Sequence, residues 1–386
     1  MQTVILAAGE GNRLWPLTAN RPKPMLPVGN VPILESVLEA AIDAGAEDVV
    51  FVVGYGRERI QNHFGNGEDW DVSIEYVVQD RQLGAAHALA QAEPVVDGPV
   101  LVLHGDQFVD AAVLERLLDR WDRTETATVA VTQSDRATEY GAVTVEAETV
   151  TGVSTTPTTD PPFLVNAGSY VFDGSVFETI QALSAEHSGT YDIATLLRRL
   201  ADGDGLSALI DRDARTTLTH LWDLLAVNGQ VLHARAAPAV PDGVHDSAVV
   251  SSDVALDASV SVGPSSALLP GTSLGRNVVV GSNVTLSNCV VLEDARVGDG
   301  AVLHDCIVGE AAEIGPNATA EGGPARVVVD GSVYDDVVLG GVFGDRTRLR
   351  GAVTVEPGTV VGPGVTADCG SVLRGRLVAG DTTRRS

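Results

Sequence analysis

Apolar runs of strand length alternate with amphipathic stretches of helical length through the N-terminal part of the chain. Buried strands are predicted at residues 3–7, 48–53, 72–78 and 99–103, and helices at 32–44 and 84–92. This alternation predicts a parallel sheet with helices on both faces. Ligands in such sheets bind beyond the carboxyl ends of the strands, so a site is expected after Ala7, Val78 and Leu103.

The C-terminal part of the chain has a different period. Apolar residues recur at every sixth position from Val244 to Leu292, the register slips by one residue at Val297 and at Val308, and the step of six resumes from Phe343 to Ala379. This hexapeptide period is typical of a parallel β-helix, in which three hexads make one triangular coil and stacked coils bury the apolar ladder.

Together the two patterns predict two domains. The first is an α/β Rossmann-like domain over residues 1–236, and the second is a left-handed β-helix over residues 237–386. The junction falls in AAPAVPDG (236–243), a stretch rich in Pro, Ala and Gly. Within the second domain, Glu321 to Val342 interrupts the repeat and predicts a loop and a strand that leave the solenoid.

Charge changes the picture of the surface. The chain has 52 acidic and 25 basic residues, a net charge of −27, and its basic residues are 24 arginines and a single lysine. This composition resembles that of proteins from extreme halophiles, because at about 1 M salt the screening length falls to about 3 Å and self-repulsion is damped. Nucleic acid is not expected as a partner, since nothing here neutralises phosphates in bulk.

Targeting and redox signals point to the cytoplasm. No apolar run reaches the length of a membrane span, and MQTVILAAGEGNR lacks the basic leader of a signal peptide. The three cysteines are too few and too scattered for a disulfide framework, and no Cys or His cluster has zinc-site spacing. We therefore expect a cytoplasmic protein with no membrane partner.

One segment carries the candidate chemistry. Directly after the first predicted strand, residues 6–28 read LAAGEGNRLWPLTANRPKPMLPV. Gly9 and Gly11 offer a turn whose backbone N–H groups can face phosphate oxygens, and Arg13 and Lys23 supply cations. Glycines alone would indicate only a local turn. Lys23 is the only lysine of the chain, and its compact charge suits a single phosphate oxygen where an arginine fork does not.

This segment resembles the signature of sugar-1-phosphate nucleotidyltransferases, and the resemblance extends over nearly the whole chain. It implies that Arg13 and Lys23 are catalytic, gripping the phosphates and stabilising the charge that passes to pyrophosphate. It implies a nucleotide-binding loop that contains Leu6, Ala7, Ala8, Gly9 and Gly11.

Other motifs extend the resemblance. Gln79, in VVQDRQLGAAHAL, corresponds to the glutamine that reads the base, and Gly84 and Ala85 line the same pocket. Asp106, in LHGDQFV, corresponds to the aspartate that contacts the nucleotide and holds Mg²⁺. Gly141, in EYGA, and Asn166, in NAGSYVF, correspond to sugar contacts.

Two departures from the family pattern concern the sugar and the metal. The family places Glu-Lys-Pro eleven residues before Asn-Ala-Gly, whereas this chain has Thr155-Thr156-Pro157. The family also has a second metal-binding Asp shortly before Trp-Asp-Leu-Leu, where this chain has Thr217. Asp211 or Asp213 could substitute if the loop is shifted.

The C-terminal repeats resemble those of bifunctional uridylyltransferase/acetyltransferases. That family uses a histidine for acetyl transfer, and this chain has no histidine after His304, so acetyltransferase activity is not expected. Such β-helices commonly trimerise, which predicts a homotrimer.

Two hypotheses from different classes follow. The first is an enzyme that joins a nucleoside triphosphate, UTP before dTTP, to glucose-1-phosphate or N-acetylglucosamine-1-phosphate. The second is a non-catalytic, sugar-nucleotide-sensing paralogue. The presence of Arg13, Lys23 and Asp106 favours the enzyme.

The charge balance yields a first testable prediction. From about 0.01 M to about 1 M KCl the screening length shrinks from about 30 Å to about 3 Å, which damps repulsion within the protein and between the protein and its polyanionic substrates. We expect the melting temperature to rise over this range and KM for the nucleotide not to increase. A KCl titration in which stability and nucleotide affinity both fall above about 0.5 M would contradict the halophile interpretation.

Overall fold

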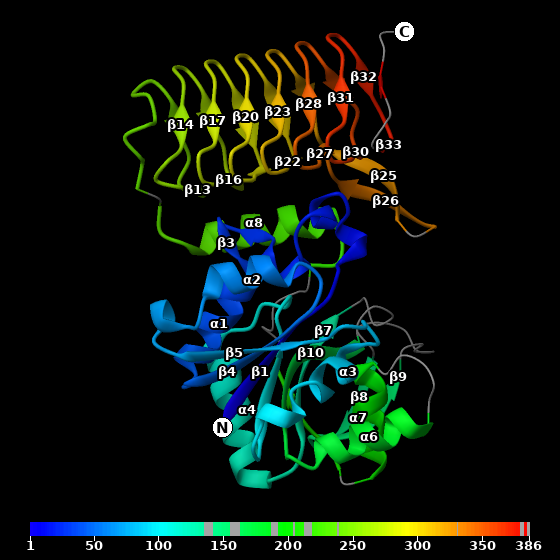
Figure 1. The fold of residues 1–386 in the computed structure, drawn as a ribbon. Helices are drawn as coiled ribbons and strands as arrows, with labels where there is room; N and C mark the ends of the chain where they lie inside the picture. The colour runs from blue at the N-terminus through cyan, green and yellow to red at the C-terminus, as the bar shows by residue number, and fades with distance from the viewer. Residues whose placement is uncertain are drawn as a thin grey trace. The chain divides into compact units, whose positions relative to one another are not determined.

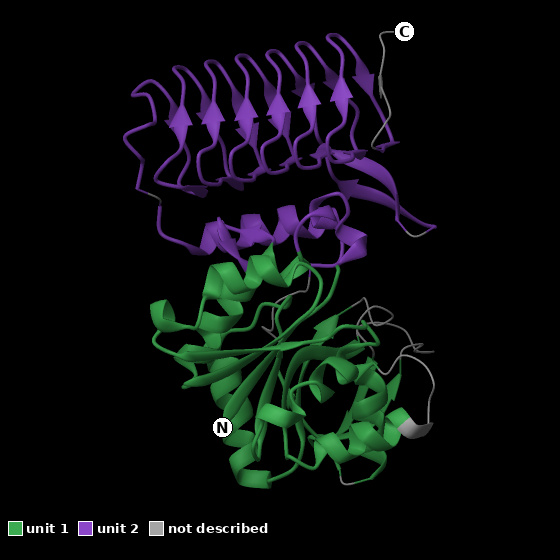
Figure 2. Cartoon of the chain, viewed as in Figure 1, with its two compact units in different colours: residues 1–10, 22–25, 33–217 green, residues 11–21, 26–32, 218–386 purple. Residues whose placement is uncertain are grey.

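The chain forms two compact units. The structure, a computed structural model, describes residues 1–386 apart from 135–141, 155–162, 187–191, 204, 212–217, 238, 330, 379–381 and 384–386. The first unit contains residues 1–10, 22–25 and 33–217, and the second contains residues 11–21, 26–32 and 218–386 (Figure 2). The segment that carries the predicted chemistry is therefore divided between the two units. The boundary at residues 236/237 stays a prediction about the domains.

A nine-stranded sheet forms the centre of the first unit, in the order β5-β4-β1-β6-β10-β7-β11-β9-β8 (Figure 1). Its first four strands pair in parallel: β5 (Ser73–Val78), β4 (Asp48–Val53), β1 (Gln2–Ala7) and β6 (Val100–His104). These are the four strands that the sequence predicts. All four end at one edge of the sheet, which is the edge where a site is expected.

The rest of the sheet is mixed, where the sequence predicts only parallel strands. β10 (Phe163–Phe172) runs antiparallel to β6 and to β7 (Thr128–Ser134), and β11 (Ser207–Ile210) is parallel to β7. β8 (Ala142–Glu146) and β9 (Thr149–Ser154) form a hairpin at the edge. The hairpin turns at Ala147 and Glu148, both in the left-handed conformation that a two-residue type I′ turn requires. A direct hairpin reverses the chain without a crossover helix, so these strands are antiparallel.

Two groups of helices cover the sheet. One group is α1 (Ile33–Asp43) with α4 (Ala111–Thr124), and the other is α3 (Ala85–Ala90), α6 (Val176–Glu186) and α7 (Ile193–Asp202). Val4 and Leu6 of β1 share a core with residues of the second group, and the alternation of side chains turns Ile5 to the opposite face.

The remaining helices are short or lie outside these groups. They are α2 (Arg57–Phe64) and α8 (Leu221–Ala234), with the short 3₁₀ helices η1 (Asn12–Leu14), η2 (Leu17–Ala19), η3 (Lys23–Met25), η4 (Glu68–Trp70) and η5 (Glu93–Val95). No helix among the residues described is long and apolar enough to cross a bilayer.

The second unit contains a left-handed β-helix of three parallel sheets with seven strands each (Figure 1). The first sheet is β12 (Val249–Val250), β15 (Ala267–Leu268), β18 (Thr285–Ser287), β21 (Val302–His304), β24 (Thr319–Ala320), β29 (Thr354–Val355) and β32 (Val372–Leu373). The second is β13 (Val254–Leu256), β16 (Thr272–Leu274), β19 (Val290–Val291), β22 (Ile307–Val308), β27 (Gly341–Phe343), β30 (Thr359–Val361) and β33 (Arg376–Leu377). The third is β14 (Ser261–Val262), β17 (Val279–Val280), β20 (Arg296–Val297), β23 (Glu313–Ile314), β28 (Arg348–Leu349), β31 (Thr366–Ala367) and β34 (Thr382–Thr383).

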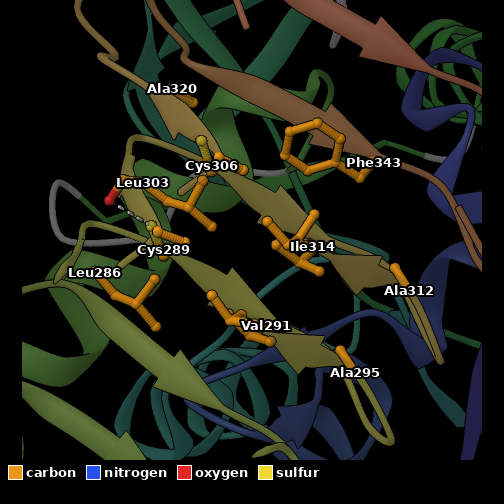
Figure 3. Close-up of a cluster of buried hydrophobic side chains, with 14 of the residues drawn as sticks. Leu286, Cys289, Val291, Ala295, Leu303, Cys306, Ala312, Ile314, Ala320 and Phe343 are labelled. Carbon is orange, nitrogen blue, oxygen red and sulfur yellow. Dashed lines mark hydrogen bonds between the residues drawn. The ribbon is translucent and has the colours of Figure 1, made fainter. Parts of the chain in front are cut away.

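The apolar positions of the hexads stack inside the β-helix. Leu286, Leu303 and Ala320 follow one another in consecutive coils and are fully buried (Figure 3). One detail of the predicted register is wrong, because Val291 rather than Leu292 pairs with Leu274. The first slip therefore lies before Val291 and not at Val297.

The cause of both slips is a shortened corner. Asn288 and Asp305 occupy the left-handed conformation at these corners, and each is followed by a fully buried cysteine, Cys289 or Cys306. The slip at Val308, which follows the second of these corners, is confirmed.

A hairpin leaves the β-helix between β24 and β27. It consists of β25 (Pro324–Val329) and β26 (Ser332–Val338), paired antiparallel. The sequence predicts a loop and one strand here, so the departure from the solenoid is confirmed and the structure adds the second strand.

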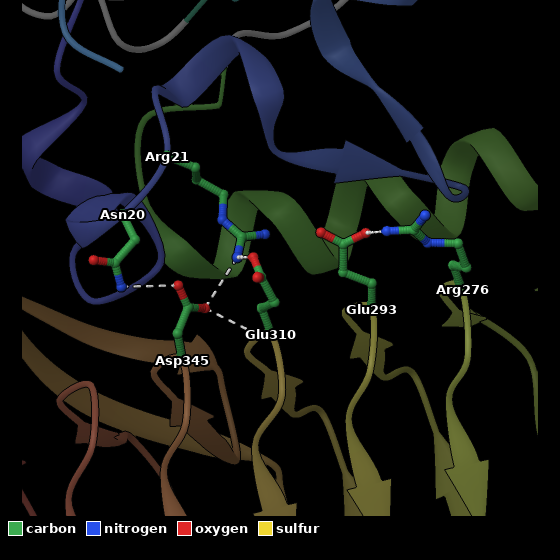
Figure 4. A network of polar contacts seen from close by, with 6 residues as sticks. All are labelled: Asn20, Arg21, Arg276, Glu293, Glu310 and Asp345. Carbon is green, nitrogen blue, oxygen red and sulfur yellow. Dashed lines mark hydrogen bonds and ion pairs between the residues drawn. The ribbon is translucent and has the colours of Figure 1, made fainter. Parts of the chain in front are cut away.

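A buried ion network ties residues 11–21 to the β-helix (Figure 4). The guanidinium of Arg21 is 3% exposed and donates from Nη2 to Asp345 Oδ1 at 3.0 Å and to Glu310 Oε2 at 2.9 Å. Asp345, 2% exposed, also accepts from Asn20 Nδ2 and from the backbone N–H of Glu310. One atom, Arg21 Nε, is buried without a hydrogen-bond partner among the residues that the structure describes. Asp345 is therefore the acceptor on which the cation mainly depends.

This network gives the second prediction. Asp345→Ala should lower the free energy of unfolding by about 3–5 kcal/mol, because it leaves a buried guanidinium with one carboxylate. Denaturant titration at fixed high KCl measures the loss. The matched control, Asp335→Ala, removes a carboxylate that is 66% exposed and should change stability by less than about 0.5 kcal/mol. Equal effects of the two substitutions would show that the network does not stabilise the fold.

Candidate active site

A pocket of about 300 Å³ lies in the first unit where β1, β5 and β6 end. Its lining is drawn from the strand ends, the turn before α3 and the proline after Lys23: Leu6, Ala8, Gly9, Pro24, Gln79, Gln82, Gly84, Ala85, Ala88, His104 and Asp106. The structure thus brings together segments that are far apart in the sequence, at the edge where a ligand is expected.

Seven of the predicted site residues line this pocket: Leu6, Ala8, Gly9, Gln79, Gly84, Ala85 and Asp106. Ala7 lies between two of them at the end of β1. Gly11 and Arg13 belong to the second unit, where Arg13 follows Asn12 in the short helix η1 (Asn12–Leu14). Gly141 lies outside the described residues.

Lys23 and Asp106 form an ion pair beside the pocket. Lys23 Nζ lies 2.6 Å from Asp106 Oδ2, and the two side chains are 13% and 28% exposed. Burial acts to raise the pKa of Asp106, but the charges of Lys23 and His104 and the hydrogen bond from Lys23 outweigh it and leave this pKa below its ordinary value. Asp106 is therefore an anion near neutral pH, which a cation-binding carboxylate must be.

A chain of hydrogen bonds leads from the strand end of β6 to Asn166. The Asn166 amide donates from Nδ2 to the Tyr170 hydroxyl at 2.6 Å, and that hydroxyl lies 3.3 Å from Nε2 of His104. Asn166 Oδ1 accepts the backbone N–H of Gly168, whose φ of +77° suits glycine. Asn166 is thus held in place by its neighbours, and its side chain is almost fully buried.

The charge states of this chain follow from burial. Burial and the charge of Lys23 lower the pKa of His104 more than Asp106 raises it, so the imidazole is neutral near pH 7. Burial also raises the pKa of Tyr170, with the hydrogen bond from Asn166 acting the other way, so the phenol keeps its proton. The Tyr170 hydroxyl oxygen accepts a hydrogen bond from Asn166, so the hydroxyl proton is available for a hydrogen bond to Nε2 of His104.

The opposite side of the pocket is built around Gln79. This buried side chain uses Nε2 to contact Nδ1 of His87 at 2.8 Å and the carbonyl oxygen of Gly84 at 3.2 Å. Gln82 donates from Nε2 to the carbonyl oxygen of Ala8 at 2.8 Å. The segment after β5 is thereby fastened to the loop after β1.

Sequence reasoning missed four lining residues: Pro24, Gln82, Ala88 and His104. His104 and Gln82 carry polar groups that the site uses. His104 could have been found, because it is the last residue of β6 and stands directly before Gly105 and Asp106. Gln82 had no such signal, since its contact to Ala8 depends on how two loops meet.

The chain's similarity to known proteins agrees with this geometry. Residues 2–223, more than half of the chain, match the Nucleotidyl transferase family, and residues 250–382 match the GMPPB C-terminal domain. The chain belongs to the nucleotidyl transferase family. This result confirms the family resemblance that the signature segment carries.

Some known relatives match nearly the whole of this chain, and others match about half of it. A Methanococcus vannielii protein named Bifunctional protein GlmU is 27% identical over 393 residues, which cover 94% of this chain and 92% of that protein. UTP–glucose-1-phosphate uridylyltransferase AglF of Haloferax volcanii is 37% identical over 199 residues, covering 50% of this chain and 81% of the relative.

A solved structure shows the same fold for the N-terminal part. It is assigned as a glucose-1-phosphate thymidylyltransferase from Bacillus anthracis, with a TM-score of 0.55, 24% identity, and coverage of 60% of this chain and 94% of that one. With the family match and the relatives, the chain is a sugar-phosphate nucleotidyltransferase.

Nucleotidyltransferases of this family generally use a divalent metal, and the described residues offer one carboxylate for it. No group of three His, Cys, Asp or Glu side chains that could hold a metal occurs in the described part of the chain. Asp211, one of the two candidates for a second ligand, is buried and paired with Arg116 of α4. Asp213, Thr217 and 155–157 lie outside the described residues.

The Lys23–Asp106 geometry gives the third prediction. Lys23→Arg should lower kcat/KM at least about tenfold, a cost of about 1.4 kcal/mol, because a guanidinium fork cannot occupy the position of a compact ammonium 2.6 Å from Asp106. Steady-state kinetics measure the change. Arg276→Lys, at an exposed ion pair with Glu293, is the matched control and should leave the rate unaltered. An unchanged kcat/KM in Lys23→Arg would remove the lysine from the mechanism.

Proposed function

We propose that this chain forms a nucleoside diphosphate sugar and pyrophosphate from a nucleoside triphosphate, UTP before dTTP, and glucose-1-phosphate or N-acetylglucosamine-1-phosphate. The observation that carries the proposal is one pocket with the base-side glutamine, Gln79, and the charged residue Asp106 in its lining, and with Lys23 paired to Asp106. A nucleotide needs both an amide for its base and charges for its phosphates.

The reaction needs no covalent protein nucleophile. A phosphate oxygen of the sugar-1-phosphate attacks the α-phosphorus in line, the new P–O bond forms, and the bond to the β-phosphate oxygen breaks with pyrophosphate leaving. Catalysis of this kind rests on positioning and on stabilising the negative charge that moves to pyrophosphate. Lys23 supplies a fixed cation for that charge, and Arg13, from the same segment, supplies a second.

Asp106 fits a Mg²⁺ ion. Magnesium in nucleotide sites is held by one or two carboxylates together with substrate phosphates, so an ionised Asp106 is a sufficient protein ligand. The bound ion would neutralise charge on the phosphates. Asp106 also holds Lys23 in place, and the neutral His104 beside it does not compete for the metal with a positive charge.

The base and sugar sides follow from the same residues. The Gln79 amide nitrogen has partners in Gly84 and His87, so its carbonyl oxygen is the group that suits the N3–H of uracil or thymine. UTP is favoured because the run from Gln82 to Ala88 resembles uridylyltransferases and because the Haloferax volcanii relative is named for UTP and glucose-1-phosphate. We assign Asn166 and Gly141 to the sugar.

A homotrimer formed through the β-helix, a cytoplasmic location and adaptation to high salt complete the proposal. The hexapeptide repeats support the trimer, and the net charge of −27 with one lysine supports the salt adaptation. A non-catalytic, sugar-nucleotide-sensing role is the second candidate. The observation that favours it is the pairing of Asp211 with Arg116, which occupies a candidate for the second metal ligand.

Pyrophosphate release tests the proposal directly. The purified chain is assayed at molar KCl with UTP, dTTP, CTP and GTP against glucose-1-phosphate and N-acetylglucosamine-1-phosphate. We expect release with UTP and one of the two sugars. Binding of a nucleotide sugar without release from any pair would support the sensing role instead.

The fourth prediction separates Asp106 as a ligand from Asp106 as a structural residue. Asp106→Asn should fold normally and raise the Mg²⁺ concentration needed for half-maximal rate, because an amide binds Mg²⁺ more weakly than a carboxylate. Magnesium titrations of the initial rate measure the shift. Asp119→Asn, on the exposed face of α4, is the control. If the magnesium dependence of Asp106→Asn matches the wild type, Asp106 is not the ligand.

A further inference from the structure

Two acceptors fix the orientation of the Gln79 amide. Its nitrogen, Nε2, lies 3.2 Å from the carbonyl oxygen of Gly84 and 2.8 Å from Nδ1 of His87. An amide nitrogen carries two hydrogens, so these two contacts use both of them. Because Gln79 is only 5% exposed, turning the amide over would set its carbonyl oxygen against the Gly84 oxygen with little water to compensate.

The contact with the imidazole requires one particular state of His87. A ring nitrogen accepts a hydrogen bond only when it carries no proton, and the Gly84 carbonyl oxygen identifies Nε2 of Gln79 as the donor. Burial lowers the pKa of His87, so the ring is neutral near pH 7 and its one proton lies on Nε2. Gln91 donates to the backbone carbonyl oxygen of His87 and stands 3.5 Å from the ring Nε2, too far to impose the other tautomer.

His87 acts on the pocket of the first unit through Gln79. It belongs to α3 and is not part of the pocket lining, whereas Gln79 is. The Gln79 carbonyl oxygen, Oε1, accepts no hydrogen bond from the residues that the structure describes. A nearly buried acceptor of this kind needs a donor, and a ligand in the pocket can supply it.

Pyrimidine bases differ at the atom that meets such an acceptor. Uracil and thymine carry a hydrogen on N3, which can donate to Oε1. N3 of cytosine is itself an acceptor, so it would face Oε1 with a lone pair and leave both groups unsatisfied. An amide that cannot turn over therefore rejects cytosine, whereas an amide that turns over admits cytosine by presenting Nε2.

We propose that His87 is a positioning residue that makes this pocket select uracil and thymine nucleotides over cytosine nucleotides, by holding the Gln79 amide with its carbonyl oxygen toward the base. This role rests on the proposed function, which places a nucleotide base beside Gln79. It adds to that function a side chain that sets the base specificity without lining the pocket.

Calorimetric titration of the full chain with UTP, dTTP and CTP tests the role, at the KCl concentration that gives the highest melting temperature. No sugar phosphate is added, so no transfer takes place. His87→Leu removes the acceptor and should lower the preference for UTP over CTP about tenfold, which is the worth of one hydrogen bond. The ratio of Kd for UTP to Kd for dTTP should not change, because both bases donate from N3.

A conservative variant separates positioning from packing. In His87→Asn, Oδ1 takes the place of Nδ1 as the acceptor, so the preference for UTP over CTP should return to within about threefold of the wild type. His63→Leu is the matched control, since His63 lies on α2, pairs with Glu35 and does not line the pocket. It should leave all three affinities unchanged.

Two results would overturn the role of His87. One is an equal loss of affinity for all three nucleotides in His87→Leu, which is what damage to packing alone produces. The other is a preference in His87→Asn, with a wild-type melting temperature, that stays as low as in His87→Leu.

Failure of the proposed function gives a different result. If UTP binds and no sugar phosphate yields pyrophosphate, transfer fails, and the ratio of the UTP and CTP affinities still decides the role of His87. If the wild type releases pyrophosphate and binds CTP as tightly as UTP, transfer stands and the role of His87 is overturned. Where transfer occurs, His87→Leu should raise KM for UTP and leave kcat unchanged, because base contacts do not change during the reaction.

Discussion

The ion pairing of the buried Arg21 side chain is the interaction that holds the signature segment, residues 6–28, in place. Its carboxylate partners, Glu310 and Asp345, come from turns of the β-helix, so an ion network of the second unit holds the segment that precedes Lys23. Only Pro22 separates Arg21 from Lys23 in the sequence, and Lys23 is paired with Asp106 in the first unit. Two neighbouring basic residues of the signature therefore form ion pairs in two different units.

Buried charge explains why these two cations have such different partners. Arg21 is nearly inaccessible and needs carboxylates to offset its desolvation, and its planar fork can serve two of them. Lys23 keeps some exposure and a single short contact, which leaves its ammonium able to meet a phosphate. The residue type at each of the two positions matches its carboxylate partners among the described residues: Arg21 pairs with two carboxylates and Lys23 with one.

Sequence periodicity predicted the architecture well because each period reports one local geometry. The four strands that end at the site and the β-helix were all found, since burial of strand and hexad faces imposes a fixed repeat on apolar residues. The antiparallel β10 and the early register slip were missed. The register slip depends on a single corner at Asn288, whose left-handed conformation carries no periodic signal. The direction of β10 is set by its pairing with β6 and β7, which the pattern of apolar residues does not encode.

The candidate site was predicted where residues follow strands directly and missed where loops meet. Gln79 follows the end of β5 directly and Asp106 lies two residues beyond the end of β6, so their positions in the chain predicted their positions in the pocket. Gln82 lines the pocket because it donates a hydrogen bond to the carbonyl oxygen of Ala8, a contact that the spacing of residues in the sequence does not predict. Arg21 was also missed, because it looked like an ordinary basic residue beside the more conspicuous Arg13 and Lys23.

The length of the signature follows from its two sets of contacts, one in the first unit and one with the β-helix. Gly9 and Pro24, near its two ends, line the pocket of the first unit, and Lys23 pairs with Asp106 beside it. Between them, Trp15 packs against Gly362 and Arg376, and Asn20 and Arg21 bind Asp345. A phosphate loop alone would need only the first turn. A segment that both lines the pocket of the first unit and packs against the β-helix needs fixed residues along its whole length, which is why the signature contains so many side chains that do not line that pocket.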